Sequence, residues 1–337
     1  MNETPAAGLG RIGAAVVAIA AMLPYLTLKI LWLTGNSLGV TDPEFMEGSV
    51  MYGMNAMTFG MEAVALVLAL GFTMRWGMRL PAWLVLLPLW VGTGLLGVIV
   101  LVTPLGLLIE GPSVFEAAGP IEPWVYVVVY GGFVGQGAGL MTAFALYARD
   151  RWPGVLTTAV GLPYPSATRP FQRVVAWGSA LMAAGIAAVR LFWAFGGGGG
   201  LPPQVADTMT PAGALQQGVK GVLAVAAGAA LVVLVRARGR GPFWRPLAVA
   251  WLGSGSLFAW GLYAMIVKVT AAPLGAGSTA LPGLLELGGL LAGMAMGMAG
   301  AFLLAERSGV RDVQPAQQPL EAEDGDGDRQ AAYQGHD

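Results

Sequence analysis

The chain has 337 residues, of which 56% are hydrophobic and only 11% are charged, with a formal net charge of −1. Soluble domains carry about 25% charged residues, so most of this chain's surroundings must be lipid rather than water. The absence of cysteine excludes disulfides, thiol nucleophiles and iron–sulfur ligation.

Apolar stretches long enough to cross a bilayer recur along the chain. A spanning helix needs roughly 20 residues, and the unbroken apolar runs lack the polar alternation of a barrel strand. The first run has no small-residue cleavage site after it, which favours a retained helix over a cleaved signal. The predicted spans are Arg11–Thr34, Val50–Met74, Pro81–Thr103, Pro123–Ala148, Phe171–Phe195, Ala212–Val235, Phe243–Thr270 and Gly283–Ala305.

The loop charges predict the orientation. Alternate loops carry no Lys or Arg and hold acidic residues instead: Asp42, Glu44, Glu47, Glu110, Glu116, Glu122 and Asp207. Because basic loops stay on the cytoplasmic side, both termini are predicted to be cytoplasmic, in a multi-pass protein of the cell membrane. The basic residues of the termini and remaining loops are Arg11, Arg75, Arg79, Arg149, Arg151, Arg169, Arg173, Arg236, Arg238, Arg240, Arg245, Arg307, Arg311 and Arg329.

An internal repeat is visible when the chain is shifted against itself. A shift of about 160 residues aligns the third span with the seventh and the end of the first with the end of the fifth. Each unit has an even number of spans, which predicts two parallel four-helix repeats with a crevice between them. The predicted division is a first repeat at 1–148, a cytoplasmic linker at 149–170, a second repeat at 171–306 and a disordered acidic cytoplasmic tail at 307–337. The matched residues are Arg79, Pro81, Trp83, Leu86, Trp90, Gly92, Gly94 and Leu96 with Arg240, Pro242, Trp244, Leu247, Trp251, Gly253, Gly255 and Leu257, and Lys29, Trp32 and Gly35 with Arg190, Trp193 and Gly196.

The ends of the first and fifth spans, "LPYLTLKILWLTGNSLG" and "AAVRLFWAFGGGGG", share a basic-x-x-Trp-x-x-Gly element. This element resembles helix ends in uncharacterised multi-pass membrane proteins of high-GC actinobacteria. The resemblance implies a membrane protein of actinobacterial source, and it carries no known activity. The four tryptophans at span ends, Trp32, Trp83, Trp193 and Trp244, are predicted to be interfacial anchors.

Six charged residues fall inside predicted spans, where a charge costs about 3 kcal/mol at the bilayer centre and marks a candidate functional site. Counting 1.5 Å per residue, Glu62 lies near the midplane and the other five lie toward the external side. Lys268 and Glu286 are expected to reach the outer headgroups. Glu62 is expected to pair with Lys220, its counterpart in the other repeat, or with Lys29 on the neighbouring helix. The six are Lys29, Glu62, Arg190, Lys220, Lys268 and Glu286.

Either pairing leaves surplus positive charge, which an anionic group should compensate. The candidate ligand-binding residues are therefore Lys29, Glu62, Arg190 and Lys220, with Asn55, Gln136, Gln216 and Gln217 as polar neighbours, although plain interhelical hydrogen bonding is the favoured explanation of the amides. The predicted function is transport or binding of an anionic solute or lipid headgroup.

Two alternatives stay open. One is a non-catalytic structural or accessory subunit that packs against another membrane protein. The other is an enzyme acting on a lipid or cell-envelope substrate, with Glu62 as acid or base. The only histidine is His336, in the tail, and no aspartate lies within a span, so haem, zinc and aspartyl-protease chemistry have no residues to use. Membrane lipids are the expected surroundings, and no metal, cofactor or nucleic-acid partner is predicted.

Overall fold

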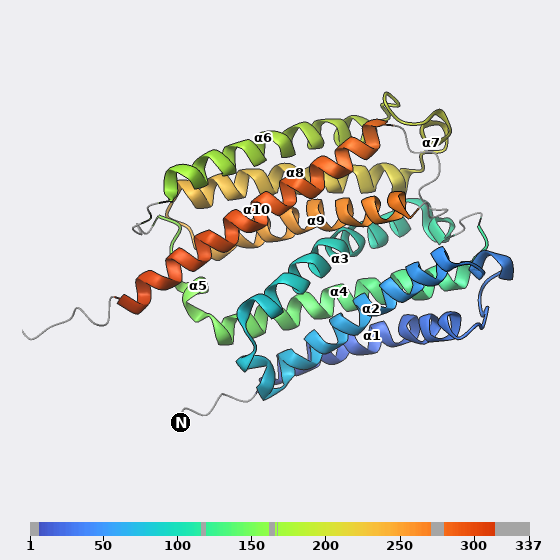
Figure 1. Cartoon of the computed structure of the whole chain (residues 1–337), viewed down its shortest axis with the longest axis horizontal. Coiled ribbons are helices and arrows are strands. Elements are labelled where there is room, and N and C mark those ends of the chain that lie inside the picture. Colours follow the sequence, from blue (N-terminus) through green and yellow to red (C-terminus); the bar gives the residue numbers. More distant parts are fainter. Residues whose placement is uncertain (1–6, 116–118, 162–165, 167, 271–279, 314–337) are drawn as a thin grey trace, which may run out of the picture.

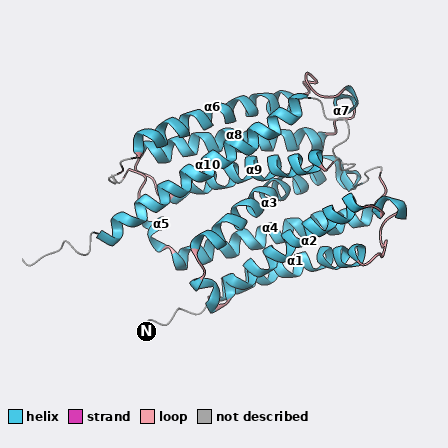
Figure 2. Cartoon of the chain, in the orientation of Figure 1, coloured by secondary structure: helices cyan, strands magenta, loops and turns pink. Residues whose placement is uncertain are grey.

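The computed structural model describes residues 7–115, 119–161, 166, 168–270 and 280–313. Over these residues the protein is helical and contains no β-strand (Figure 2). Eight of the described helices are long and apolar enough to cross a membrane. They are α1 (Leu9–Leu33), α2 (Ser49–Thr73), α3 (Ala82–Glu110), α4 (Pro123–Arg151), α6 (Arg169–Ala194), α8 (Pro211–Arg236), α9 (Trp244–Val269) and α10 (Ala280–Val313). Short helices lie in the connections: η1 (Pro43–Met46), η2 (Arg75–Arg79), η3 (Gly111–Phe115), α5 (Pro153–Thr157) and α7 (Pro203–Asp207).

Two helices extend further than their sequence predicts. α3 continues to Glu110, whose carboxylate accepts a hydrogen bond from the backbone N–H of Ala212 at the start of α8. A carboxylate is favourable there because the first N–H groups of a helix have no intrahelical partner. α10 continues to Val313, so the predicted boundary of the tail at residue 307 is too early. Residues 314–337 lie outside the described part of the chain.

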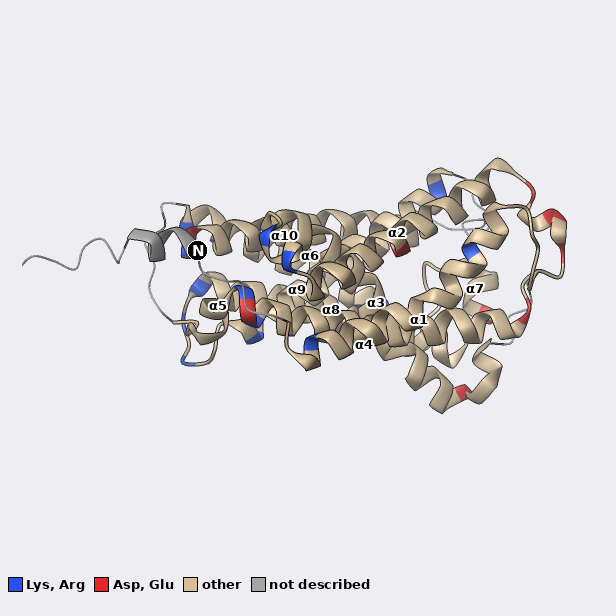
Figure 3. Cartoon of the chain, turned by 90° about the horizontal axis from the view of Figure 1, so that it is seen from below, with Lys and Arg blue, Asp and Glu red and all other residues tan. Residues whose placement is uncertain are grey.

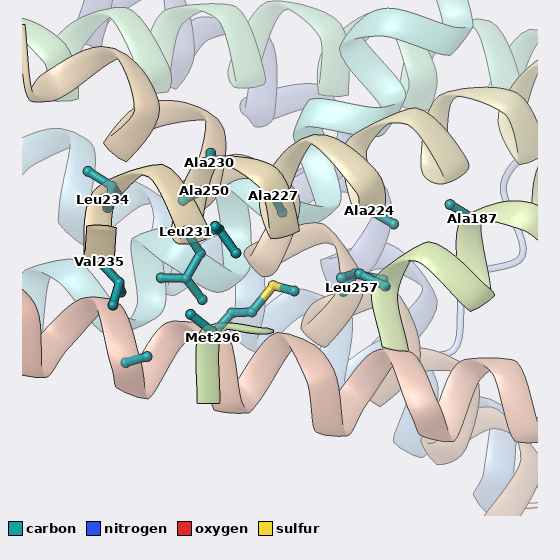
Figure 4. Packing of buried hydrophobic residues seen from close by; sticks show 14 of the residues in the cluster. Ala187, Ala224, Ala227, Ala230, Leu231, Leu234, Val235, Ala250, Leu257 and Met296 are labelled. Carbon is teal, nitrogen blue, oxygen red and sulfur yellow. The ribbon is translucent and has the colours of Figure 1, made fainter. Parts of the chain in front are cut away.

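The long helices form two groups of four (Figure 1). In the first group, α1 packs against α2 and α4, and α3 packs against α4. In the second group, α6 packs against α8 and α10, and α9 packs against α8 and α10. Each group has its own apolar core: the first around Phe72, Leu140 and Tyr147, and the second around Leu231 and Met296 (Figure 4). The contact of α3 with α9 and α8 joins the two groups.

At the seam between α3 and α9, the indole N–H of Trp90 donates to the hydroxyl of Ser254 at 3.0 Å. The indole of Trp251 donates to the hydroxyl of Thr93, also at 3.0 Å. The two bonds are reciprocal, because a shift of 161 residues relates Trp90 to Trp251 and Thr93 to Ser254. The indole N–H groups of both tryptophans therefore bind across the seam.

The ends of α1 and α6 have the same local structure. The indole of Trp32 donates to the carbonyl of Leu38, and that of Trp193 donates to the carbonyl of Gly199, both at 2.9 Å. Both tryptophans are buried, so the prediction that they are interfacial anchors is wrong: each closes the loop after its helix. Trp83 and Trp244 are exposed, as interfacial anchors would be.

Charge is sorted along the long axis of the bundle. Figure 3 shows most Lys and Arg at the end that holds α5 and most Asp and Glu at the opposite end. The start of α1 and the end of α10 lie at the basic end, whereas α7 lies at the acidic end (Figure 1). The candidate site residues lie between these two ends.

Candidate functional site

Lys29 occupies a closed polar and aromatic pocket in the first group. It lies on α1 and is 6% exposed. Its ammonium donates to the side-chain carbonyl of Asn55 on α2 at 2.7 Å. The same nitrogen lies 4.9 Å from the ring centroids of Tyr25 and Trp32. Negative ring faces stabilise a cation in a low-dielectric setting, so Lys29 is held by one amide oxygen and two aromatic rings.

Glu62 lies on α2 and is also buried, with 6% exposure. Its carboxyl group accepts a hydrogen bond from the amide of Gln136 on α4 at 2.8 Å. The side-chain oxygen of Gln136 is buried and has no hydrogen-bond partner among the described residues. The contact therefore satisfies one N–H donor of Gln136 and leaves the side-chain oxygen of Gln136 without a donor among the described residues.

The predicted ion pair of Glu62 is wrong. Within the described part of the chain, no cationic nitrogen lies within 4.0 Å of its carboxylate, neither that of Lys220 nor that of Lys29. Lys220 belongs to the second group, and Lys29 is held by Asn55 instead. The amide of Gln136 occupies the position that a cation was expected to take.

Arg190 anchors a second charged cluster, in the second group. One terminal nitrogen of its guanidinium lies 2.7 Å from the carboxylate of Glu286 on α10. The other donates to the side-chain oxygen of Gln217 on α8, also at 2.7 Å. The planar guanidinium can serve both partners at once. Glu286 was expected to reach the outer headgroups, and this contact shows that it pairs with Arg190 across α6 and α10.

Lys220 lies on α8 in the same neighbourhood as Arg190 and Glu286, both of which act on it electrostatically. Its ammonium lies 3.9 Å from the ring centroid of Trp260 on α9. No described carboxylate lies within 4.0 Å of that ammonium. The indole nitrogen of Trp260 is buried and has no hydrogen-bond partner among the described residues.

The candidate residues thus form two clusters instead of one. The first cluster is Lys29, Asn55, Glu62 and Gln136; the second is Arg190, Gln217, Lys220, Trp260 and Glu286. A groove of about 400 Å³ does lie between the two groups, where α2 faces α9. Its lining is mainly apolar and includes Met54, Met57 and Ile266, and no member of either cluster lines it. Lys268 is exposed, as its predicted snorkelling requires.

Sequence reasoning missed the roles of Trp260 and Glu286. Trp260 looked like one of several apolar tryptophans, because no spacing rule connects it to a lysine on another helix. Glu286 lies near the start of its span, where a headgroup contact is the simplest explanation of a charge. The balance of charges inside the spans could have indicated the contact of Glu286 with Arg190, since a buried arginine on a neighbouring helix requires an anion.

No group of three or more His, Cys, Asp or Glu side chains that could hold a metal ion occurs among the described residues. No family model matches the chain, and no curated protein and no solved structure matches it at a significant level.

Proposed function

We propose that this membrane protein binds an anionic group, a carboxylate or a phosphate, at the second cluster, as part of the binding or transport of an anionic solute or of a lipid headgroup. The observation that carries the proposal is Lys220, a cation inside a spanning helix with no described carboxylate within 4.0 Å.

The charges of the second cluster do not balance. Arg190 and Lys220 are cationic, and Glu286 is the one carboxylate of the cluster among the described residues; it contacts Arg190 and acts on Lys220 electrostatically. Glu286 is bound to Arg190, and no described carboxylate lies within 4.0 Å of the ammonium of Lys220. An isolated charge in a low-dielectric region is costly, and a bound anion removes that cost.

Hydrogen-bond donors in the cluster point to the same ligand class. The ammonium of Lys220 and the indole N–H of Trp260 both lack an acceptor among the described residues. An anionic oxygen accepts from both types of donor and gains from the positive charge. A cationic or purely apolar ligand would leave both donors unpaired.

The position of the cluster supports access from outside the cell. Arg190 lies near the end of α6, and Glu286 near the start of α10, in the half of the bundle closer to the acidic end. If the basic end is cytoplasmic, as the positive-inside rule favours, the second cluster lies nearer the external surface. Neither the accessory-subunit nor the enzyme alternative has a comparable observation in its favour.

The test is thermal unfolding of the purified protein with a panel of anions at constant ionic strength: phosphate, sulfate, a dicarboxylate and chloride. We expect at least one oxyanion to raise the Tm, because a ligand that binds only the folded state stabilises it. In a parallel experiment, nanodiscs of phosphatidylglycerol and of phosphatidylcholine distinguish a lipid headgroup from a free solute. A rise in Tm in phosphatidylglycerol nanodiscs, with no rise for any soluble anion, assigns the site to a lipid headgroup.

The variant Lys220→Gln should lose this stabilisation, whereas the matched control Lys268→Gln should keep it. Without anion, Lys220→Gln should unfold no earlier than the parent protein, because it removes a charge that has no described carboxylate within 4.0 Å. If no anion or anionic lipid stabilises the parent protein, or if Lys220→Gln responds like the parent, the proposal is wrong.

A further inference from the structure

We propose that Glu62 and Gln136 form a proton-binding site in the first group, in which Glu62 is held as a neutral carboxylic acid. This inference rests on the first cluster and is independent of the anion site.

The surroundings of Glu62 disfavour a carboxylate. Glu62 lies in the middle of α2 and is 6% exposed, and Gln136 is 2% exposed. No cationic nitrogen of the described residues lies within 4.0 Å of the carboxyl group, and one amide N–H is its single hydrogen-bond donor among those residues. A buried carboxylate needs a close counter-ion or several donors, and without them such a group takes up a proton.

Lys29 does not require a charged Glu62. Its ammonium already has the oxygen of Asn55 and the rings of Tyr25 and Trp32 around it. These three groups form a cation site on α1 and α2. Glu62 and Lys29 therefore have separate partners, although they lie close enough to act on each other electrostatically.

The unsatisfied oxygen of Gln136 identifies where the proton is shared. In the carboxylate form, Gln136 donates one N–H to Glu62 and its own buried oxygen has no donor. Adding one proton to the free carboxylate oxygen creates an O–H that can donate to this amide oxygen. The acid and the amide are then paired by two hydrogen bonds, with no other bond formed or broken.

The neighbouring helices supply few other titratable groups. α1 contributes Lys29 and Tyr25, both of which act on Glu62 electrostatically. α4 contributes the neutral Gln136, and α3 has no titratable side chain before Glu110 at its far end. A metal cation is a poor fit for the same position, because it prefers about six oxygen ligands and Asn55 already binds Lys29.

Infrared spectroscopy of the full-length protein in lipid tests the proposal, because a protonated carboxyl group has a C=O band distinct from that of a carboxylate. At neutral pH we expect such a band in the parent protein and its loss in Glu62→Gln. The control Glu286→Gln should keep the band, since Glu286 lies in the other cluster, in contact with Arg190.

A second variant tests the partner. Gln136→Leu should shift the frequency of the Glu62 band, because the acid loses its hydrogen-bonded amide, and a merely structural role of Gln136 would not move this band. The proposal is overturned if the neutral-pH spectrum contains no band that depends on Glu62, or if Gln136→Leu leaves the frequency unchanged. Disappearance of the band on adding Na⁺ at constant pH would also overturn it, in favour of a sodium site.

Discussion

Three cations of the two clusters, Lys29, Arg190 and Lys220, have different sets of neighbours. Lys29 uses an amide oxygen and two aromatic rings, and Arg190 uses a carboxylate and an amide oxygen. The residue types suit these sites: a compact ammonium fits between rings, whereas a guanidinium reaches two acceptors in different directions. Lys220 has one ring and no acceptor in the described structure, which is why we propose it as the ligand-binding residue.

These contacts reverse an expectation about stability. From the sequence, Glu62 is expected to be ion-paired and Glu286 to reach the headgroups, so that Glu62→Ala would be the more destabilising substitution. Because Glu286 is the residue that contacts a guanidinium, we now expect Glu286→Ala to cost more than Glu62→Gln, by roughly 1–3 kcal/mol. This is below the cost for a fully buried pair, since the side chain of Glu286 is 20% exposed.

Reversible unfolding in mixed micelles measures the difference. The double variant Arg190→Gln/Glu286→Gln should recover part of the loss, because it removes both charges together. Equal stabilities of Glu286→Ala and Glu62→Gln would show that the contact between Arg190 and Glu286 contributes little.

At the scale of the elements, the seam between α3 and α9 depends on two glycines. A Cβ on Gly94 would overlap the backbone of Gly255, and a Cβ on Gly255 would overlap the carbonyl oxygen of Trp90. Lipid provides no hydrophobic force between helices, so close backbone packing and interhelical hydrogen bonds supply the association. The reciprocal bonds of Trp90 and Trp251 form because these glycines bring the helices together.

Gly94→Ala should therefore destabilise the protein, by about 1–3 kcal/mol, since backbone cannot move aside as a flexible side chain can. Gly92→Ala is the matched control on the same helix, because no atom lies within 4 Å of its added Cβ. Thermal unfolding in one detergent compares the two. Gly92→Ala should match the parent or exceed it slightly, since alanine favours the helix, and a Gly94→Ala protein as stable as Gly92→Ala would contradict the close contact.

At the scale of the whole molecule, the separation of charge along the bundle is the main guide to orientation. Basic residues gather at the end that holds α5, and acidic residues at the end that holds α7 (Figure 3). We propose on this basis that the α5 end is cytoplasmic, in the cell membrane.

Single cysteines test this orientation, and the cysteine-free chain makes the labelling unambiguous. Thr157 in α5 and Gln204 in α7 are both exposed and lie at opposite ends. An impermeant thiol reagent should label Gln204→Cys on intact cells and Thr157→Cys only after lysis. Labelling of Thr157→Cys on intact cells would show that the orientation is inverted.

The arrangement of two similar four-helix groups stays a prediction, but several details agree with it. The positive φ angles of Gly35 and Gly196, 87° and 89°, occur 161 positions apart, as do the loop-closing tryptophans Trp32 and Trp193. The seam tryptophans have the same spacing. A common ancestor of the two groups would explain why separate positions share one offset.

The sequence by itself determined the class of the protein and the positions of its helices. Lipid admits few charged side chains and no unpaired backbone N–H or C=O groups, so long unbroken apolar runs form helices. The ends of most helices fall close to the predicted ones. The sequence also identified the charged residues inside the spans, which are the candidate site residues. It could not pair them, because Glu62 and Gln136, or Arg190 and Glu286, come from different helices, and hydropathy does not encode which faces meet. Tertiary packing decided that Glu62 contacts an amide, that Glu286 contacts Arg190, and that Lys220 lies over Trp260 with no described carboxylate within 4.0 Å. The physical reason is that hydrogen bonds and ion pairs act over a few ångströms, and only the packing of the helices sets distances at that scale.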